Sequence, residues 1–262
     1  MGTPRRLVFG EVAELYDRHR PTYPAGLVED LAARLLAGSR ALEVGAGTGK
    51  ATALFAARGI ALLAVEPSPE MAAIARRACA GFPDAEVVES DFESWAPAGE
   101  AFGLLYCAQA WHWIDPARRY ALARAALARG AWLAVFWNRP AWDASPVREG
   151  LAAVYRRIAP GMSIAGPLHP ANPSPGEEPD EDWEAEIAAA GGFTEPERRT
   201  YRWSTEYDAA GFTGMLATVS EFRLLDPETR RRLLAAVGDT ITEHGGTLQM
   251  PMLTRLHLAR AD

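Results

Sequence analysis

The sequence predicts an α/β fold in which a doubly wound, mostly parallel sheet of seven strands carries helices on both faces and a helical insertion toward the C-terminus. Apolar runs of strand length alternate with helical segments of about a dozen residues, the order that a parallel sheet requires. Glycines or acidic residues follow several of these runs, and ligands of such sheets bind at the carboxyl ends of the strands. The predicted fold is therefore Rossmann-like.

The elements are expected in the following order. Strands are predicted over residues 42–44, 60–66, 86–90, 102–108, 131–137, 198–204 and 247–258. Helices are predicted over residues 25–37, 50–58, 70–80, 146–158 and 183–190, with a helical insertion over 209–244. The stretch 159–182 is rich in proline, glycine and acid, which indicates a long loop that is either a substrate lid or a solvated excursion.

Composition limits the class of protein. The 262 residues are 48% hydrophobic, which is enough for one α/β domain with an elaboration. The net charge of −7 disfavours extended contact with a nucleic-acid backbone. The chain lacks an uncharged apolar run of membrane-spanning length and a signal peptide, so we expect a cytoplasmic protein without membrane contact. Cys79 and Cys107 have no metal-ligand spacing and are expected to be buried thiols; no metal is predicted, and the oligomeric state is open.

A glycine-rich turn joins the first strand to the next helix. Gly45, Gly47 and Gly49 occupy every second position after Glu43. Glycine lets the backbone approach a ligand closely, and a helix N-terminus favours an anionic group. The letters do not fit the dinucleotide motif G-x-G-x-x-G, because the third glycine comes one position early. They do not fit a P-loop either, because its first glycine and its hydroxyl residue are replaced. A tight turn without a ligand is the alternative.

Acidic residues follow the next two strands. Glu66 lies 21 residues after Gly45, close to the spacing of about 20 at which a carboxylate meets ribose hydroxyls. The alternative for Glu66 is a solvated strand end. Asp91 and Phe92 follow the third strand, and Met71 lies in the first turn of a helix, where methionine commonly fills a core.

This ordered series resembles the class I S-adenosylmethionine-dependent methyltransferases, whose first motif has the form Glu-x-Gly-x-Gly-x-Gly. Residues 9–140 follow the pattern of the small-molecule members, and residues 108–115 resemble a trans-aconitate-methyltransferase-like subgroup. The resemblance implies S-adenosylmethionine as cofactor and a small-molecule methyl acceptor. Oxygen is the expected acceptor atom, with nitrogen and carbon left open. It also implies a cofactor-covering segment over 1–38, a cofactor-binding core over 39–140, and substrate-pocket insertions with the last two strands over 141–262.

The resemblance carries roles to individual residues. The expected cofactor-binding residues are Arg20, Glu43, Gly45, Gly47, Gly49, Glu66, Met71, Asp91, Phe92 and Ala108. Glu43 and the glycines would hold the methionine end, Glu66 the ribose, and Asp91, Phe92 and Met71 the adenine. Arg20 could pair with the carboxylate of the cofactor, although a surface turn stiffened by two prolines explains it equally well.

The expected acceptor-binding residues are Tyr16, Tyr23, Gln109, Trp111, Trp113 and Trp137. His112 is the candidate general base, because it follows the fourth strand and its ordinary pKa lies near neutrality. The alternative is a structural imidazole between Trp111 and Trp113. The three tryptophans are expected to converge as an apolar pocket or a cation–π wall, with plain packing as the alternative.

Other functions remain to be weighed. Base-modifying relatives usually carry Asn/Asp-Pro-Pro-Tyr/Phe or Pro-Cys after the fourth strand, whereas this chain has Tyr106-Cys107 and then Gln109-Ala-Trp-His112. A nucleic-acid substrate is therefore not expected. A nicotinamide-dependent oxidoreductase on the same sheet and a cofactor-binding regulatory protein without catalysis are the two alternatives, and the glycine spacing argues against the first.

Overall fold

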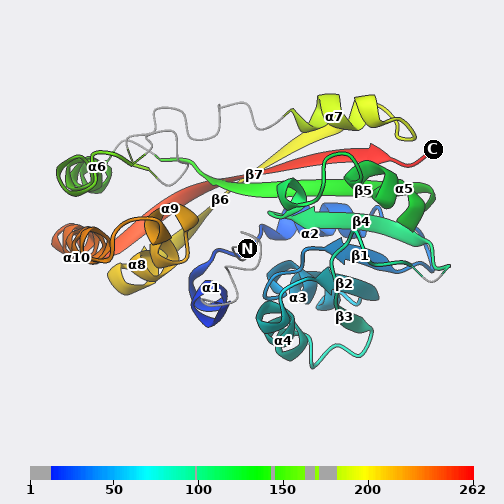
Figure 1. The fold of residues 1–262 in the computed structure, drawn as a ribbon, viewed down its shortest axis with the longest axis horizontal. Coiled ribbons are helices and arrows are strands. Elements are labelled where there is room, and N and C mark those ends of the chain that lie inside the picture. Colours follow the sequence, from blue (N-terminus) through cyan, green and yellow to red (C-terminus); the bar gives the residue numbers. More distant parts are fainter. Residues whose placement is uncertain (1–12, 98, 143–144, 163–168, 171–181) are drawn as a thin grey trace.

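The structure, a computed structural model, describes residues 13–97, 99–142, 145–162, 169–170 and 182–262. Its centre is a seven-stranded sheet with the order β3-β2-β1-β4-β5-β7-β6 (Figure 1). The strands are β1 (Ala41–Val44), β2 (Leu62–Glu66), β3 (Ala85–Glu89), β4 (Phe102–Ala108), β5 (Leu127–Pro140), β6 (Glu197–Asp208) and β7 (Thr247–Arg260). Among the described strands, β7 is antiparallel to both β5 and β6, and the other neighbouring strands are parallel to each other. The predicted mostly parallel, doubly wound sheet is confirmed.

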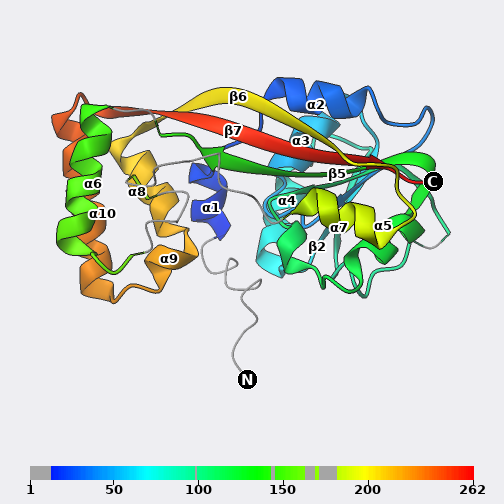
Figure 2. The same cartoon turned by 90° about the horizontal axis from the view of Figure 1, so that it is seen from above.

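Helices cover both faces of this sheet and one end of its extended strands. They are α1 (Ala13–His19), α2 (Ala25–Ala32), α3 (Lys50–Ala56), α4 (Pro69–Ala78), α5 (Arg119–Ala126), α6 (Pro146–Ile158), α7 (Trp183–Ala190), α8 (Ala209–Ala217), α9 (Ser220–Arg223) and α10 (Pro227–Glu243). Alternate side chains of each central strand enter different cores. Tyr106 and Phe136 pack with α2 and α3, whereas Leu105 and Val135 pack with α5 and α7 on the opposite face (Figure 2).

The strands β5, β7 and β6 extend beyond the rest of the sheet and carry four helices at their far end (Figures 1 and 2). We call α6 and α8–α10 the helical lobe. Its core joins Leu233, Val237 and Ile241 of α10 to Phe212 of α8 and Tyr155 of α6. The helical lobe therefore shares its strands with the sheet instead of forming a separate body.

Several boundaries differ from the predictions. The predicted insertion is three helices, and α10 begins at Pro227 because Asp226 caps it by accepting a 2.9 Å hydrogen bond from the amide of Thr229. The strand β5 is twice as long as its apolar centre, because its C-terminal end continues to pair with β7 and Leu127 at its start pairs with Phe102 of β4. Most of the predicted loop over 159–182 lies outside the described residues, as do the first twelve residues of the predicted covering segment.

The described part of the chain also bears on its cysteines, on membrane-spanning helices and on metal ligands. Cys79 and Cys107 are buried free thiols, as predicted. No described helix has the length and apolar character needed to cross a membrane. No cluster of three or more metal-ligating side chains occurs in the same residues.

Candidate cofactor and acceptor site

A cavity of about 560 Å³ opens at the carboxyl ends of the parallel strands, in the size range of small-molecule pockets. Its walls come from the ends of β1, β2, β4 and β5, from the region of α1 and from the helical lobe. Most of the predicted site residues line it together: Tyr16, Arg20, Tyr23, Glu43, Gly45, Gly47, Glu66, Met71, Asp91, Phe92, Ala108, Gln109, His112 and Trp113. Gly49, Trp111 and Trp137 are not among the lining residues.

Glu43 is a buried carboxyl group at the end of β1. Its Oε2 atom accepts hydrogen bonds from the hydroxyls of Thr52 at 2.6 Å and Tyr106 at 2.9 Å. Its Oε1 atom is buried and has no hydrogen-bond partner. Burial raises the pKa of Glu43 to about 8. An unsatisfied buried acceptor is costly, so this oxygen is suited to a ligand that brings a donor or a positive charge.

Glu66, at the end of β2, joins the glycine turn to α4. Its Oε2 atom accepts a 2.8 Å hydrogen bond from the amide of Gly47, and its Oε1 atom accepts one of 2.9 Å from the amide of Ser68. Burial raises the pKa of this carboxyl group above its ordinary value. Each carboxylate oxygen has a second lone pair, so Glu66 retains acceptor capacity toward the cavity.

Two of the three glycines, Gly45 and Gly49, allow neighbouring segments to pack closely. Gly45 and Gly49 both have positive φ angles, 72° and 83°. A Cβ atom on Gly45 would lie 2.5 Å from the Cβ of Ala110, in the loop after β4. A Cβ atom on Gly49 would lie 2.9 Å from the Cα of Ala75 in α4. Gly49 lies outside the cavity lining and allows α3 and α4 to pack closely, and its contact with a cofactor stays a prediction.

Arg20 connects the segment after α1 to the helical lobe. Its Nε donates a 2.8 Å hydrogen bond to the hydroxyl of Thr218, and its Nη2 donates one of 3.3 Å to the carbonyl of that residue. At the other side of α1, the Nζ of Lys50 donates to the carbonyl of Asp17 at 2.5 Å. The segment thus bridges the sheet and the helical lobe, and a contact of Arg20 with a cofactor stays a prediction.

The loop after β4 places His112 and Trp113 on the cavity wall, with their rings 4.7 Å apart. It begins with Gln109, a non-glycine residue with a φ of 65°, whose amide donates to the carbonyl of Phe136 at 2.9 Å. A strained conformation of this kind is often found at functional sites. Partial burial, and then the positive charge of Arg139, lower the pKa of His112 to about 4. The imidazole is therefore neutral at pH 7.

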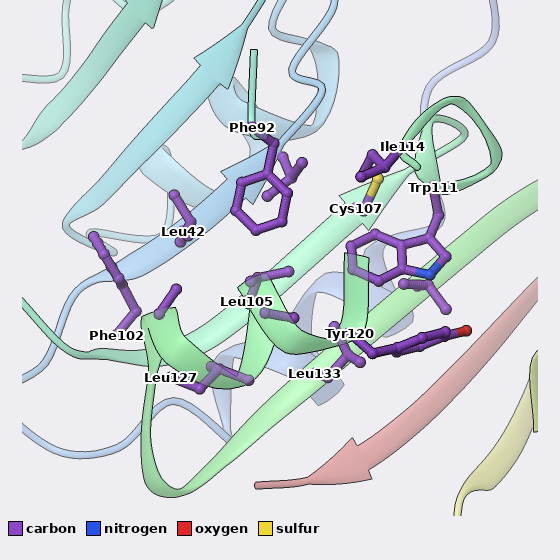
Figure 3. Packing of buried hydrophobic residues seen from close by; sticks show 14 of the residues in the cluster. Leu42, Phe92, Phe102, Leu105, Cys107, Trp111, Ile114, Tyr120, Leu127 and Leu133 are labelled. Carbon is purple, nitrogen blue, oxygen red and sulfur yellow. The ribbon is translucent and has the colours of Figure 1, made fainter. Parts of the chain in front are cut away.

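Trp111 and Trp137 pack in the core and do not line the cavity, so the packing alternative holds for these two tryptophans. Trp111 is fully buried, and the centres of its ring and that of Tyr120 are 5.6 Å apart. Figure 3 shows the two side chains next to each other. Trp137 stacks on Trp183 of α7 at 4.7 Å, with an angle of 9° between the rings. Because side chains alternate along β5, Trp137 enters the core under α7, and the residues after it form the cavity wall.

Other lining residues were not predicted. They are Thr48, Lys50, Asn138, Arg139, Pro140, Tyr207, Met215, Val219, Ser220, Glu221, Met250 and Met252, together with residues adjacent to predicted ones. Thr48 is notable because its hydroxyl oxygen is buried without a hydrogen-bond partner. Met250 and Met252 are two positions apart on a strand and so share a face, a pattern that the sequence does contain.

Comparison with known proteins gives a concordant result. Residues 41–129 match the family model of a methyltransferase domain, in agreement with the resemblance described above for this part of the chain. An uncharacterized methyltransferase from Mycobacterium tuberculosis is 34% identical over 157 residues, which is 55% of this chain and 63% of that protein. The chain therefore matches less than two thirds of the length of this relative.

Solved structures share the fold. A protein described as a type II methyltransferase from Anaeromyxobacter dehalogenans superposes with a TM-score of 0.63 and 22% identity, over 92% of this chain and 97% of that one. An S-adenosylmethionine-dependent methyltransferase from Geobacter sulfurreducens, solved with S-adenosylhomocysteine, gives a TM-score of 0.51 and 17% identity over 99% of each chain. Both likenesses agree with the predicted Rossmann-like fold.

Proposed function

We propose that this chain, whose residues 41–129 match a methyltransferase domain, is an S-adenosylmethionine-dependent methyltransferase that acts on oxygen of a small molecule. The observation that carries the proposal is the unpartnered buried Oε1 of Glu43, a residue that lines the same cavity as Glu66 and Asp91. The presence of S-adenosylhomocysteine in the Geobacter sulfurreducens structure supports the same cofactor class. The trans-aconitate-like subgroup and a cytoplasmic location stay predictions from the sequence.

The residues present fit this cofactor. The ammonium group of its methionine end would give Oε1 of Glu43 the partner that it lacks, and the buried hydroxyl of Thr48 is a further polar group at that end. Glu66 would accept from the ribose hydroxyls, as acidic residues at this spacing do in nucleotide-binding sheets. Asp91 would accept from the adenine amino group, and Met71 and Phe92 would pack on the ring.

In the proposed reaction the cofactor would supply the methyl group, and the chain would orient the acceptor and accept its proton. When bound, S-adenosylmethionine supplies an electrophilic methyl group that leaves its sulfur as an acceptor atom donates an electron pair to the carbon. The cavity walls orient the acceptor, and such positioning is worth about 7–11 kcal/mol. His112 is neutral at pH 7 and can take the proton of a hydroxyl acceptor; because its low pKa makes it a weak base, we expect a contribution at the lower end of the usual range, about 10²-fold. Its low pKa then favours release of that proton to solvent.

Calorimetric titration tests the proposal directly. S-adenosylmethionine, S-adenosylhomocysteine and NADH are titrated into the wild type, Glu66→Gln and Glu89→Gln. Glu89 is the matched control, because it is the exposed partner of Glu66 in the β2–β3 register and lies outside the cavity lining. We expect micromolar binding of the first two ligands, about tenfold weaker in Glu66→Gln alone, and no binding of NADH.

Other outcomes would point elsewhere. If NADH binds and neither sulfur compound does, the chain is an oxidoreductase on the same sheet. If neither class binds, only the fold remains. If S-adenosylmethionine binds but no acceptor from a broad panel is methylated, the regulatory alternative is favoured.

A further inference from the structure

One part of the cavity wall comes from the extended strands and the helical lobe. It consists of Pro140 of β5, Tyr207 of β6, Met215 of α8, Val219, and Met250 and Met252 of β7. We call these six residues the methionine wall. The residues that would hold the cofactor come instead from β1, β2 and the loops after β3 and β4. These strands form the β3-β2-β1-β4 part of the sheet, whereas the strands of the methionine wall form the β5-β7-β6 part. The methionine wall therefore belongs to the acceptor side.

The chemistry of this wall is apolar and adaptable. Met215, Met250 and Met252 are nearly fully buried in the protein, so their exposed atoms face the cavity and not bulk solvent. Methionine has a flexible, polarizable side chain that fits flat rings, and a sulfur–aromatic contact contributes about 0.3–1.5 kcal/mol. Tyr207 and the partly exposed Trp113 add aromatic surface to the same cavity. Such a lining fits an aromatic ring better than a strongly hydrated polar group.

Polar and charged side chains line the same cavity as the methionine wall. His112 and Arg139 both line the cavity, and the charge of Arg139 acts on the imidazole of His112. A guanidinium group beside a neutral imidazole favours an oxygen atom that gains negative charge as it loses a proton. Glu221 lines the cavity from α9, and burial raises the pKa of its carboxyl group. A molecule with several carboxylates would have to give up its hydration against the methionine wall.

We propose that the acceptor is a phenol: an apolar aromatic molecule whose ring lies on the methionine wall and whose hydroxyl oxygen faces His112 and Arg139. The inference rests on the proposed function, because it assumes that the cofactor occupies the side of Glu43 and Glu66. It narrows that function to one chemical class, and it excludes aliphatic polyacids as acceptors.

The first test is ligand binding by the wild-type protein. Three probes are titrated calorimetrically into the chain saturated with S-adenosylhomocysteine: 2-naphthol, its saturated analogue decahydro-2-naphthol, and citrate. We expect 2-naphthol to bind, the saturated alcohol to bind about tenfold more weakly because it lacks the aromatic face, and citrate not to bind. Citrate binding at or below the dissociation constant of 2-naphthol would overturn the proposal, and so would equal affinity for the two alcohols.

A variant pair then assigns the effect to the wall. Met252→Gln keeps the length of the side chain but introduces a polar amide, and Met162→Gln makes the same change at a methionine packed against the helical-lobe core outside the cavity lining. We expect about a tenfold loss of 2-naphthol affinity in Met252→Gln only, with unchanged affinity for S-adenosylhomocysteine in both. Unchanged 2-naphthol affinity in a folded Met252→Gln protein would contradict the proposal.

Two further arms keep the test decisive. If Met252→Gln does not give a cooperative thermal transition, Val219→Thr takes its place, because it adds one hydroxyl to the wall without a change in volume. If S-adenosylhomocysteine does not bind the wild type, the proposed function fails, and titration of 2-naphthol into the free protein still tests the wall. Failure of the cofactor and failure of the acceptor class are thereby separated.

Discussion

The guanidinium Nε of Arg20 donates a 2.8 Å hydrogen bond to the hydroxyl of Thr218, a residue 198 positions away in the chain. Thr218 is fully buried at the end of α8, and α1 lies between α8 and α4 in contact with both. The segment around Arg20 thus fastens the helical lobe to the part of the sheet that would hold the cofactor. This contact leads to the first prediction.

Thr218→Val should loosen this connection. The variant removes the acceptor hydroxyl and retains the shape, so we expect a loss of about 1–2 kcal/mol in the free energy of unfolding. Hydrogen exchange should accelerate together in residues 13–20 and 215–222. Thr213→Val is the control, because the hydroxyl of Thr213 bonds to the carbonyl of Ala209 within the same helix at 2.9 Å. Equal exchange in the two variants would refute the connection.

Cofactor binding should release a proton from Glu43. In the free protein the pKa of Glu43 is raised to about 8, so the carboxyl group is mostly protonated at pH 7. A cationic ligand group beside Oε1 lowers that pKa and expels the proton. We therefore expect affinity to rise with pH up to about 8 and then to level off. Calorimetry at pH 7 in buffers of different ionisation enthalpy measures the released proton, which should be absent in Glu43→Gln.

Glu43 should also make the stability of the ligand-free protein depend on pH. Its pKa is higher in the folded state than the ordinary value of 4.5, so between that value and about 8 the folded state binds more protons than the unfolded state. The free energy of unfolding should consequently fall as the pH rises through this range. Glu43→Gln should show a flatter pH dependence in urea titrations. An identical slope in the variant would mean that Glu43 is not buried as described.

His112 should act only in its neutral form. Because its pKa is lowered to about 4, we expect kcat/KM for a hydroxyl acceptor to show no inflexion from His112 between about pH 5 and 7. Arg139→Gln removes one cause of that shift, so an acid limb should move upward toward the ordinary imidazole value.

His112→Ala should reduce turnover by about 10²-fold, whereas His244→Ala, at the C-terminal cap of α10, should not. Full turnover in His112→Ala would exclude its role as the base.

Gly49→Ala should be more destabilising than its backbone angle alone explains. Gly49 and Gly59 have similar φ angles of 83° and 74°, but a Cβ atom would meet Ala75 only at Gly49. Gly59→Ala therefore measures the cost of the left-handed conformation, about 1–2 kcal/mol. The clash should add about 1–3 kcal/mol in Gly49→Ala, and Ala75→Gly should recover part of that loss. Urea unfolding of the four proteins gives these differences, and equal losses in the two glycine variants would remove Gly49 from the α3–α4 contact.

The sequence predicted the elements better than their surroundings. The bounds of β4, α6 and α7 agree with the prediction residue for residue, because apolar periodicity and capping residues are local signals. Glu43, Glu66 and Asp91 were predicted to share a site because they follow parallel strands, and all three line the cavity.

What the sequence did not reveal depends on contacts between distant segments. Both faces of a parallel sheet are buried, so periodicity alone could not tell whether Trp137 enters the core under α7 or the cavity. The role of Gly49 required the position of Ala75, and the role of Arg20 required that of Thr218. The methionine wall combines β6, β7 and α8, whose relative placement follows only from the assembled sheet.

The continuous strands β5, β7 and β6 also have a consequence for protein engineering. The helical lobe is attached to the sheet by backbone ladders that run without interruption from one end of the molecule to the other. A transplanted set of lobe helices, exchanged at residues 209–243, would consequently inherit its alignment with the cofactor side from strands that are left untouched. The affinity for S-adenosylmethionine should be retained in such an exchange. The methionine wall should change only at Met215 and Val219, because its other four residues lie on the untouched strands.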